Sequence, residues 1–459
     1  MRSLGVVVSA LLLAVTAAPA GAQDAAAMRR EIEQLRQQLQ GLTERLQRLE
    51  TPPQPQMAPP PPAQPAPLAQ SPANPQTQMS PLSPTDLLRP RQPFALYQQR
   101  GSGQLLFDMG VTGDFIGSIT QHNVQKSGTG TFAGRENRFF PREVELSFFG
   151  QIDPYARADV RIEAGEDAPG AETAVSLAEA TITMLTLPYG TQAKLGQLRN
   201  RFGWSNVIHE HDLPWSDRPD VYRIFLGEEG LKEKGVEATW VPDFLPFYLM
   251  VLGGVFNGDN EVAFGRGLLT HPLATGRVVA FFDLTDTMAL QAGASVANGE
   301  TNERLRSTLL GYDLKFKYRP DGWLHPLVTL ATEGIYSIRR TERGVDLDGD
   351  GSFDLFQKQT RNSFGWYGWA ELQPWRRWAF GARYDSTQYP ANPGYQWAVE
   401  PYVSFYPSEF LRFRVGYKHT DRTQRDLLDL NGNGGSARLM DELFFQATFI
   451  LGAHPAHPF

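Results

Sequence analysis

The sequence predicts an all-β transmembrane barrel of about sixteen antiparallel strands. Three observations predict it. Apolar and polar residues alternate in many short stretches, the connections between these stretches alternate between short and long, and an export signal precedes them. Leu411, Phe413, Val415 and Tyr417, for example, alternate with arginine, glycine and lysine. A period of two places one set on each face of a strand. Only every second residue then faces lipid, so a mean hydropathy of −0.35 is compatible with a membrane barrel.

The chain begins with the features of a secretory signal peptide over residues 1–22. Arg2 precedes an apolar run over residues 6–15, and residues 20–22 are small, as a cleavage site requires. The run is shorter than the roughly 20 residues of a transmembrane helix. The chain has no cysteine, and its net charge of −7 does not favour nucleic-acid binding. We therefore expect export to the outer membrane of a Gram-negative bacterium.

Two further regions precede the barrel, which we expect over residues 94–459. Residues 24–50 carry leucine, isoleucine and methionine at alternating spacings of four and three, which predicts an α-helical coiled coil. A lone amphipathic helix is the alternative, because three to four heptads are marginal. Residues 51–93 are rich in proline, glutamine and alanine, which predicts an extended linker. An even number of strands would leave the coiled coil in the periplasm.

The alternating stretches give the expected strands. They lie at 103–118, 141–150, 155–164, 175–185, 191–199, 234–242, 246–256, 273–283, 287–297, 308–318, 324–339, 361–373, 377–386, 395–406, 410–421 and 440–451. Short connections alternate with long ones, as in barrels with periplasmic turns and outer loops. Aromatic residues near the expected strand ends favour the membrane–water interface. They are Trp240, Trp366, Trp369, Trp375, Trp378, Tyr402 and Tyr406.

The longest connection, residues 200–233, is the candidate for a loop that narrows the lumen, because long loops in compact domains are usually functional or disordered. It contains many aromatic residues and charges of both signs. Arginine or lysine in a pore favours anions, and acidic residues favour cations. The candidate selectivity residues are Arg199, Arg201, His209, His211, Arg218, Arg223, Lys315, Lys317, Arg412, Arg414 and Lys418. Because acidic residues share the inward faces, a weakly selective general pore stays open as an alternative to anion preference.

The stretch from Lys194 to Gly203, together with Arg218-Pro219 and the Gly-Glu-Glu-Gly at 227–230, resembles the phosphate-selective porin O and P family. The N-terminal heptads and proline-rich spacer resemble its coiled-coil-headed branch, the DcaP-like dicarboxylate channels. The resemblance implies a homotrimeric outer-membrane porin whose third outer loop folds inward. It also implies passive diffusion of small hydrophilic solutes, with small anions such as phosphate or carboxylates as partners. A complete arginine ladder cannot be traced, so phosphate itself is not implied.

Two clusters have the residue types of metal sites. Asp346, Asp348, Asp350 and Asp354, with a glycine at the sixth position, form the front of a calcium loop, but Gln357 replaces the usual bidentate glutamate. Residues 429–434 are a weaker copy. The pairs His209 with His211 and His454 with His457 could supply zinc ligands, although neither pair alone completes a tetrahedron. The alternatives are solvated acidic turns and polar loop residues, and no cofactor is required.

Nothing in the sequence has the spacing of a catalytic motif, so we do not expect an enzyme. Ser205 near His209 lacks an orienting third group. A structural tether is a further alternative, in which the coiled coil contacts the cell wall. This role is compatible with transport.

Overall fold

The structure is a computed structural model that describes residues 98–100, 103–105, 107–166, 173–345, 355–390, 393–423 and 438–452. All of them belong to the unit Leu82–Phe459. The expected signal peptide, coiled coil and linker lie outside the described residues, as do the four aspartates of the calcium loop and both histidines of the tail. These features remain predictions.

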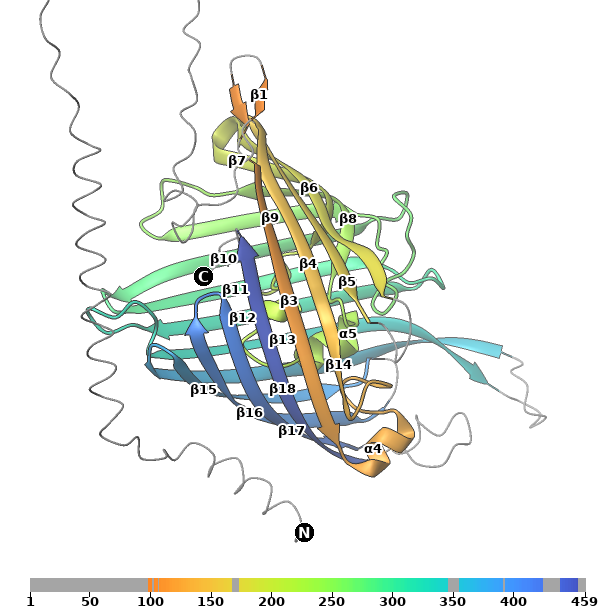
Figure 1. The fold of residues 1–459 in the computed structure, drawn as a ribbon. Helices are drawn as coiled ribbons and strands as arrows, with labels where there is room; N and C mark the ends of the chain where they lie inside the picture. Colours follow the sequence, from red (N-terminus) through yellow and green to blue (C-terminus); the bar gives the residue numbers. More distant parts are fainter. Residues whose placement is uncertain are drawn as a thin grey trace, which may run out of the picture. The chain divides into compact units, whose positions relative to one another are not determined.

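Sixteen antiparallel strands, β3 to β18, form a closed barrel (Figure 1). They are β3 (Phe107–Thr120), β4 (Arg138–Asp153), β5 (Ala156–Gly165), β6 (Ala174–Leu187), β7 (Thr191–Arg199), β8 (Lys232–Trp240), β9 (Tyr248–Phe256), β10 (Leu273–Thr285), β11 (Met288–Glu300), β12 (Arg306–Tyr318), β13 (Val328–Val345), β14 (Leu355–Trp375), β15 (Trp378–Gln388), β16 (Tyr395–Ser408), β17 (Leu411–Arg422) and β18 (Leu439–Gly452). Two short strands, β1 (Gln98–Arg100) and β2 (Gly103–Leu105), form a separate two-stranded sheet. The predicted barrel and its strand number are confirmed.

The barrel closes where the last strand meets the first. β18 pairs with β3 in antiparallel register, with Leu443 opposite Ile119 and Phe449 opposite Gly113. The Phe449 ring lies over Gly113, and a Cβ at that glycine would overlap it. Closure leaves no unpaired strand edge in the barrel, which is the condition for a sheet that contacts lipid.

The period of two sorts the side chains between the faces as predicted. On β17, Phe413, Val415 and Tyr417 are 43%, 46% and 41% exposed, whereas the intervening Arg414 and Lys418 are buried. Apolar residues therefore cover the outside of this strand and basic residues lie inside. The same alternation holds on β12, where Leu310, Tyr312 and Leu314 are outside.

The expectation for two of the interface aromatics was wrong. Trp240, Trp375 and Trp378 are exposed near strand ends, as predicted. Trp369 and Tyr402 are instead buried, and the Trp369 indole N–H donates to the Tyr402 hydroxyl at 2.7 Å. The reason is the alternation along β14, which places Trp369 on the inward face of the strand with the buried Tyr367.

The connections at the two ends of the barrel differ in length, as predicted. One end has short turns, such as residues 154–155 and 376–377, and the other has long loops, such as 121–137 and 200–231. Within the described ranges, the helical segments are α4 (His122–Ser127), α5 (Asp220–Leu226) and two 3₁₀ turns, η2 (Pro188–Gly190) and η3 (Glu210–Asp212).

Among the described residues, no helix combines the length and the apolar character needed to cross a membrane.

Candidate functional site

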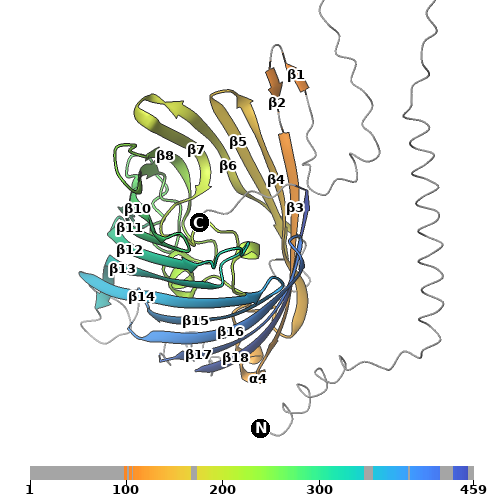
Figure 2. The ribbon, with the colours of Figure 1, turned by 90° about the vertical axis from the view of Figure 1, so that its left-hand side faces the viewer.

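The connection from β7 to β8, residues 200–231, folds into the barrel, and we call it the inward loop. Figure 2 shows the loop and its helix α5 surrounded by the strands. Trp204, Trp215 and Tyr222 of the loop are buried in one apolar cluster with Tyr367 and Trp369 of β14. Burial of these large rings away from water stabilises the loop inside the lumen. The expected inward fold is confirmed.

A single carboxylate on β13 holds the start of the loop. Glu333 accepts hydrogen bonds from the Trp204 amide at 2.6 Å, the Tyr222 hydroxyl at 3.0 Å and the Tyr367 hydroxyl at 2.5 Å. The Ser205 amide donates at 3.3 Å, and its hydroxyl also donates to this carboxylate. A buried carboxylate needs such donors, because an unsatisfied charge in the interior is costly.

The glycine before Trp204 is required by this anchor. Gly203 has a φ of 72°, a left-handed backbone conformation that residues other than glycine rarely adopt. A Cβ there would overlap the Tyr222 hydroxyl and the Glu333 carboxylate. The glycine of the family-like stretch therefore has a local structural reason.

A second anchor is an ion-pair network at the tip of the loop. Asp217 contacts the Arg383 guanidinium of β15 at 2.5 Å and the Lys418 ammonium of β17 at 2.6 Å. Lys418 also contacts Asp220 of α5 at 3.0 Å, and Arg223 contacts Asp217 at 3.3 Å. Burial raises the pKa of Asp217, but the neighbouring Arg383, Lys418 and Arg223 outweigh it and hold the pKa below its usual value of 3.8.

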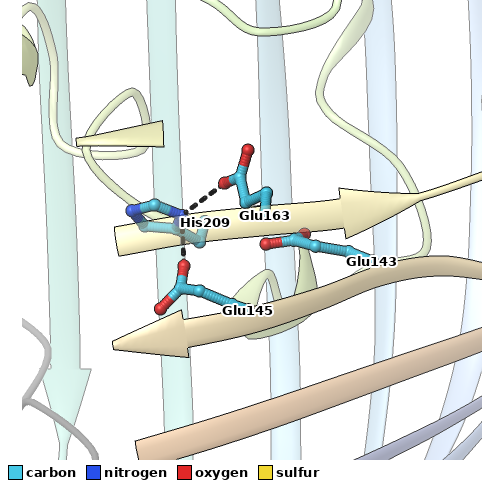
Figure 3. A group of neighbouring side chains, drawn as sticks. All are labelled: Glu143, Glu145, Glu163 and His209. Atoms are coloured by element: carbon cyan, nitrogen blue, oxygen red, sulfur yellow. Dashed lines mark hydrogen bonds and ion pairs between the residues drawn. The ribbon is translucent and has the colours of Figure 1, made fainter. Parts of the chain in front are cut away.

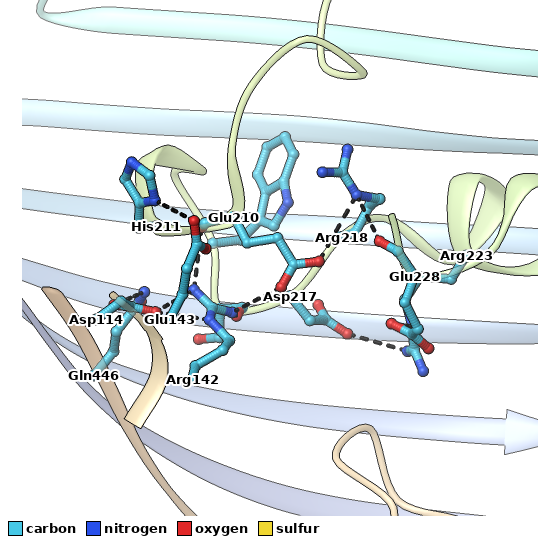
Figure 4. Close-up of polar contacts among 12 residues, drawn as sticks. Asp114, Arg142, Glu143, Glu210, His211, Asp217, Arg218, Arg223, Glu228 and Gln446 are labelled. Carbon is cyan, nitrogen blue, oxygen red and sulfur yellow. Dashed lines mark hydrogen bonds and ion pairs between the residues drawn. The ribbon is translucent and has the colours of Figure 1, made fainter. Parts of the chain in front are cut away.

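Three further arginines on the wall bind the loop backbone, and Figure 4 shows one of them, Arg142. Arg142 of β4 donates to the Ser216 carbonyl at 2.5 Å and contacts Asp114 of β3 at 2.6 Å. Arg414 donates to the Trp215 carbonyl at 2.7 Å. The other loop carbonyls bound by Arg142 or Arg412 are those of Glu210, His211 and Leu213. We call β4 and β13–β17 the clamped wall, because their inward side chains are occupied by the loop.

The opposite side of the lumen is open. A cavity of about 660 Å³ lies between the inward loop and strands β5–β11, which we call the open wall. Six basic residues and two carboxylates line it. The basic residues are Arg157, Arg161, Lys194, Arg199, Arg201 and Arg277, and the carboxylates are Glu179 and Glu237. The cavity is therefore bordered by an excess of positive charge.

The five arginines of this set are ion-paired. Arg201 contacts Glu237 at 3.3 Å, and Arg161 contacts Glu179 at 3.6 Å. The other three pairs are Arg157 with Asp159, Arg199 with Glu229 and Arg277 with Asp313. Pairing weakens the field of a guanidinium, and it does so least where the guanidinium stays exposed, as in the 52% exposed side chain of Arg157.

At the border between the two walls, His209 of the loop lies among glutamates of β4 and β5 (Figure 3). Its Nδ1 lies 2.9 Å from Glu145 and 3.1 Å from Glu163. Burial lowers the pKa of His209, but hydrogen bonds to Glu145, Glu163 and Glu179 outweigh it and raise the pKa to about 10. In the absence of a bound cation, this imidazole is therefore a cation at neutral pH.

For the neighbouring Glu210, the effect of burial on the pKa is larger than the effect of the nearby charges. Burial raises the pKa of Glu210 to about 7, although Arg142 and Arg218 partly oppose the shift. His211 contacts Glu143 at 3.0 Å, and this partner raises its pKa well above 6.5 against the effect of burial.

The structure separates the predicted selectivity residues into two groups. Arg199, Arg201 and His209 line the cavity. The remaining residues lie away from it: His211, Arg218, Arg223, Lys315, Lys317, Arg412, Arg414 and Lys418. Arg218 donates to carbonyls of its own loop, and Lys315 lies over the Trp204 ring at 4.1 Å.

Sequence reasoning passed over three residues of this region. Arg277 of β10 and Lys194 of β7 line the cavity, and Glu333 anchors the loop. Each is a charged residue at an inward position of an alternating strand, and that signal was available. Their partners were not, because the Arg277 guanidinium binds Asp313, 36 residues away.

No family model matches this chain. An uncharacterised protein of Aquifex aeolicus is 29% identical over 352 residues, which cover 69% of each chain.

Three solved structures are similar. The outer membrane channel DcaP of Acinetobacter baumannii is 11% identical, with 78% of this chain and 100% of that chain covered and a TM-score of 0.49. The anion-selective porin of Comamonas acidovorans is 9% identical, with coverage of 76% and 100% and a TM-score of 0.47. OmpT, an outer membrane protein of Vibrio cholerae, is 10% identical, with coverage of 78% and 100% and a TM-score of 0.45.

The fold and the site together define a porin-like closed barrel whose lumen is narrowed by an inward loop.

Proposed function

We propose that this protein is an outer-membrane porin for passive diffusion of small hydrophilic solutes, with a preference for small anions such as phosphate or carboxylates. The observation that carries the anion preference is the cavity beside the inward loop, where six basic residues face two carboxylates. The apolar exterior supports a lipid environment, and the charged interior supports a hydrated path.

The clamped wall narrows this proposal to part of the lumen. Arg383, Arg414 and Lys418 are nearly fully buried and bind the loop, so their donors are not offered to a solute. The anion path would therefore follow the open wall, along Arg157 and Lys194. The loop residues would set the width of this path, and the open wall would set its charge.

Bilayer recording of the purified full chain tests the function. We expect steady single-channel conductance and, in a potassium chloride gradient, a reversal potential of the sign for anion permeation. A clear cation preference would contradict the anion proposal, and equal permeability would favour the weakly selective general porin. Absence of conductance from correctly folded protein would refute the porin itself.

We further propose a homotrimer in the outer membrane, with the N-terminal coiled coil in the periplasm. The heptads of residues 24–50 and the apolar exterior of the barrel support this arrangement. A chain without residues 24–93 should still conduct. Loss of a cell-wall attachment in that variant would favour the additional tether role, and calcium in the loop at 346–354 remains a separate proposal.

A further inference from the structure

We propose that Glu143, Glu145, Glu163 and His209 form a binding site for a divalent transition-metal cation, with Zn²⁺ as the probe. Oxygen or nitrogen atoms of these four side chains lie within 4.8 Å of one another (Figure 3). This ligand set differs from the histidine pairs that the sequence suggested, because the wall supplies three of the four groups.

The strand register brings the carboxylates together. Glu143 and Glu145 are two residues apart on β4, so they share the inward face. Glu163 of β5 lies directly opposite Glu145 in the ladder. Like charges at such a position are destabilising unless a cation lies between them. All three residues are at most 9% exposed, so water screens this repulsion poorly.

The imidazole alone does not satisfy these groups. Nδ1 of His209 lies 2.9 Å from Glu145 Oε2 and 3.1 Å from Glu163 Oε1, yet it carries at most one hydrogen. Within the described ranges, the other ring nitrogen, Nε2, has no hydrogen-bond partner, although it lies 3.7 Å from Glu179. Glu145 is fully buried, and its carboxylate points at the imidazole.

Nearby basic residues balance part of the charge. The closest is His211, whose Nδ1 lies 3.0 Å from Glu143, and the guanidinium groups lie farther away. Arg161 lies 3.8 Å from Glu145, and Arg199 lies 3.6 Å from Glu163. Arg199 makes its shorter contact, 2.8 Å, with Glu229 instead. These guanidinium groups therefore reduce the repulsion, while the space among the carboxylates and the imidazole remains suited to a cation.

The donor set selects the kind of cation. One imidazole nitrogen and three carboxylate oxygens suit Zn²⁺ and similar ions, whereas Ca²⁺ and Mg²⁺ prefer oxygen ligands alone. Ligands of a tetrahedral zinc ion lie about 3.3 Å apart, given bonds of about 2.0 Å. Side-chain movements of an ångström or so would bring the four groups to that spacing.

A bound ion would join three segments of the chain. Glu143 and Glu145 belong to β4, Glu163 to β5, and His209 to the inward loop. The ion would fix the loop at the border between the two walls. Because His209 also lines the cavity, the ion would stand beside the path of a solute.

Zinc binding to the purified full chain in detergent tests the proposal. The starting protein carries His454→Gln and His457→Gln, so that the tail histidines cannot contribute. We expect one Zn²⁺ per protomer by titration calorimetry and elemental analysis, with X-ray absorption that indicates nitrogen and oxygen ligands. Absence of stoichiometric zinc in this protein would overturn the proposal.

Variants then assign the ligands. We expect His209→Gln and, independently, Glu145→Gln to abolish the stoichiometric zinc, while His271→Gln, at an exposed histidine, retains it. Heat-modified gel mobility identifies a variant that has not folded, in which case Glu163→Gln replaces it. Retention of zinc by a folded His209→Gln protein would refute the site. The test does not depend on conduction, so it can fail while the porin proposal stands.

Discussion

The clamped wall and the open wall carry the same kinds of residue at the same strand parity but use them differently. On the clamped wall, Arg383 and Arg414 are nearly fully buried, and their guanidinium groups donate to loop carbonyls. On the open side, Arg157 of β5 and Arg201 of the inward loop border a cavity and keep side chains that are 52% and 35% exposed. Arg383 and Arg414 are thus structural because the loop covers them, whereas Arg157 keeps an exposed side that a solute can reach.

The energetic consequence is an asymmetry between the two sides of one lumen. Removing a buried ionic partner leaves an uncompensated charge behind, whereas removing a hydrated charge changes mainly the local potential. Substitutions on the clamped wall should therefore change the stability of the loop. Substitutions on the open wall should change selectivity and leave the fold intact.

The largest effect is expected from Arg383→Ala. The side chain contacts Asp217 at 2.5 Å, Asp385 at 2.7 Å and Glu400 at 3.0 Å, and all three carboxylates are buried. Loss of the shared cation should lower the free energy of unfolding by about 3–5 kcal/mol. Denaturant unfolding measures the loss, and single-channel noise from a released loop accompanies it. Unchanged stability and quiet channels would mean that the ion-pair network does not hold the loop.

A smaller loss is expected from Glu333→Gln. The amide keeps the size of the side chain but replaces one acceptor oxygen with a donor, next to hydroxyls of Tyr222 and Tyr367 that donate to the carboxylate. We expect a loss of about 1–3 kcal/mol for unsatisfied donors. Glu261→Gln, at an exposed site, is the matched control. Equal unfolding curves for the two variants would contradict the anchor.

On the open wall, Lys194→Gln and Arg157→Gln should leave unfolding unchanged and reduce anion selectivity. One charge at about 10 Å in water contributes on the order of 0.4 kcal/mol for each permeating ion. Each change removes this attraction for the anion and the same repulsion for the cation, so the anion-to-cation permeability ratio should fall about fourfold at low salt. Reversal potentials measure the ratio, and Arg376→Gln in an exposed turn is the control. The reduction should shrink at high salt, because ions screen the charges. If Arg376→Gln lowered the permeability ratio as much as the cavity variants do, the charges of the cavity would have no special role in selectivity.

The smallest effect is expected from acid. The folded pKa of Asp217 is depressed below 3.8, so its contribution to stability is fully present above that value and is lost as the pH falls through the folded pKa. We expect the loop network at this residue to persist from pH 8 to about pH 4. Channels of the Asp217→Asn variant should show raised current noise at every pH, because the amide cannot replace the ion pairs. Channel noise that rises in the parent protein already near pH 6 would indicate another titrating group.

Much of the architecture could be predicted because the apolar–polar alternation that indicates a strand lies within the residues of that strand. The strand expected at 191–199 coincides with β7, and the other boundaries agree within four residues except at the end of β13 and the start of β14, which shift by six. The inward loop was recognisable by its length and aromatic content. The error over Trp369 and Tyr402 arose where nearness to a predicted strand end was given more weight than parity.

The roles of the basic residues were harder to predict. Arg218 and Arg412 were expected in the path of the solute, but they bind loop carbonyls. Glu333 was passed over because a lone inward glutamate has no motif. Its importance comes from donors on the inward loop and on β14, and no local pattern links these segments.

The sequence by itself determined the strands, the faces of each strand and the loop that is too long to be a turn, because alternation and loop length are local properties. Only the tertiary structure decided which inward charges are covered and which border the cavity. The contacts that decide this join residues far apart in the chain, such as Asp217 with Arg383, 166 positions later. The path of the loop across the lumen sets these contacts, since a guanidinium group donates to a loop carbonyl where the loop lies close and pairs with a wall carboxylate where it does not, as Arg157 does with Asp159.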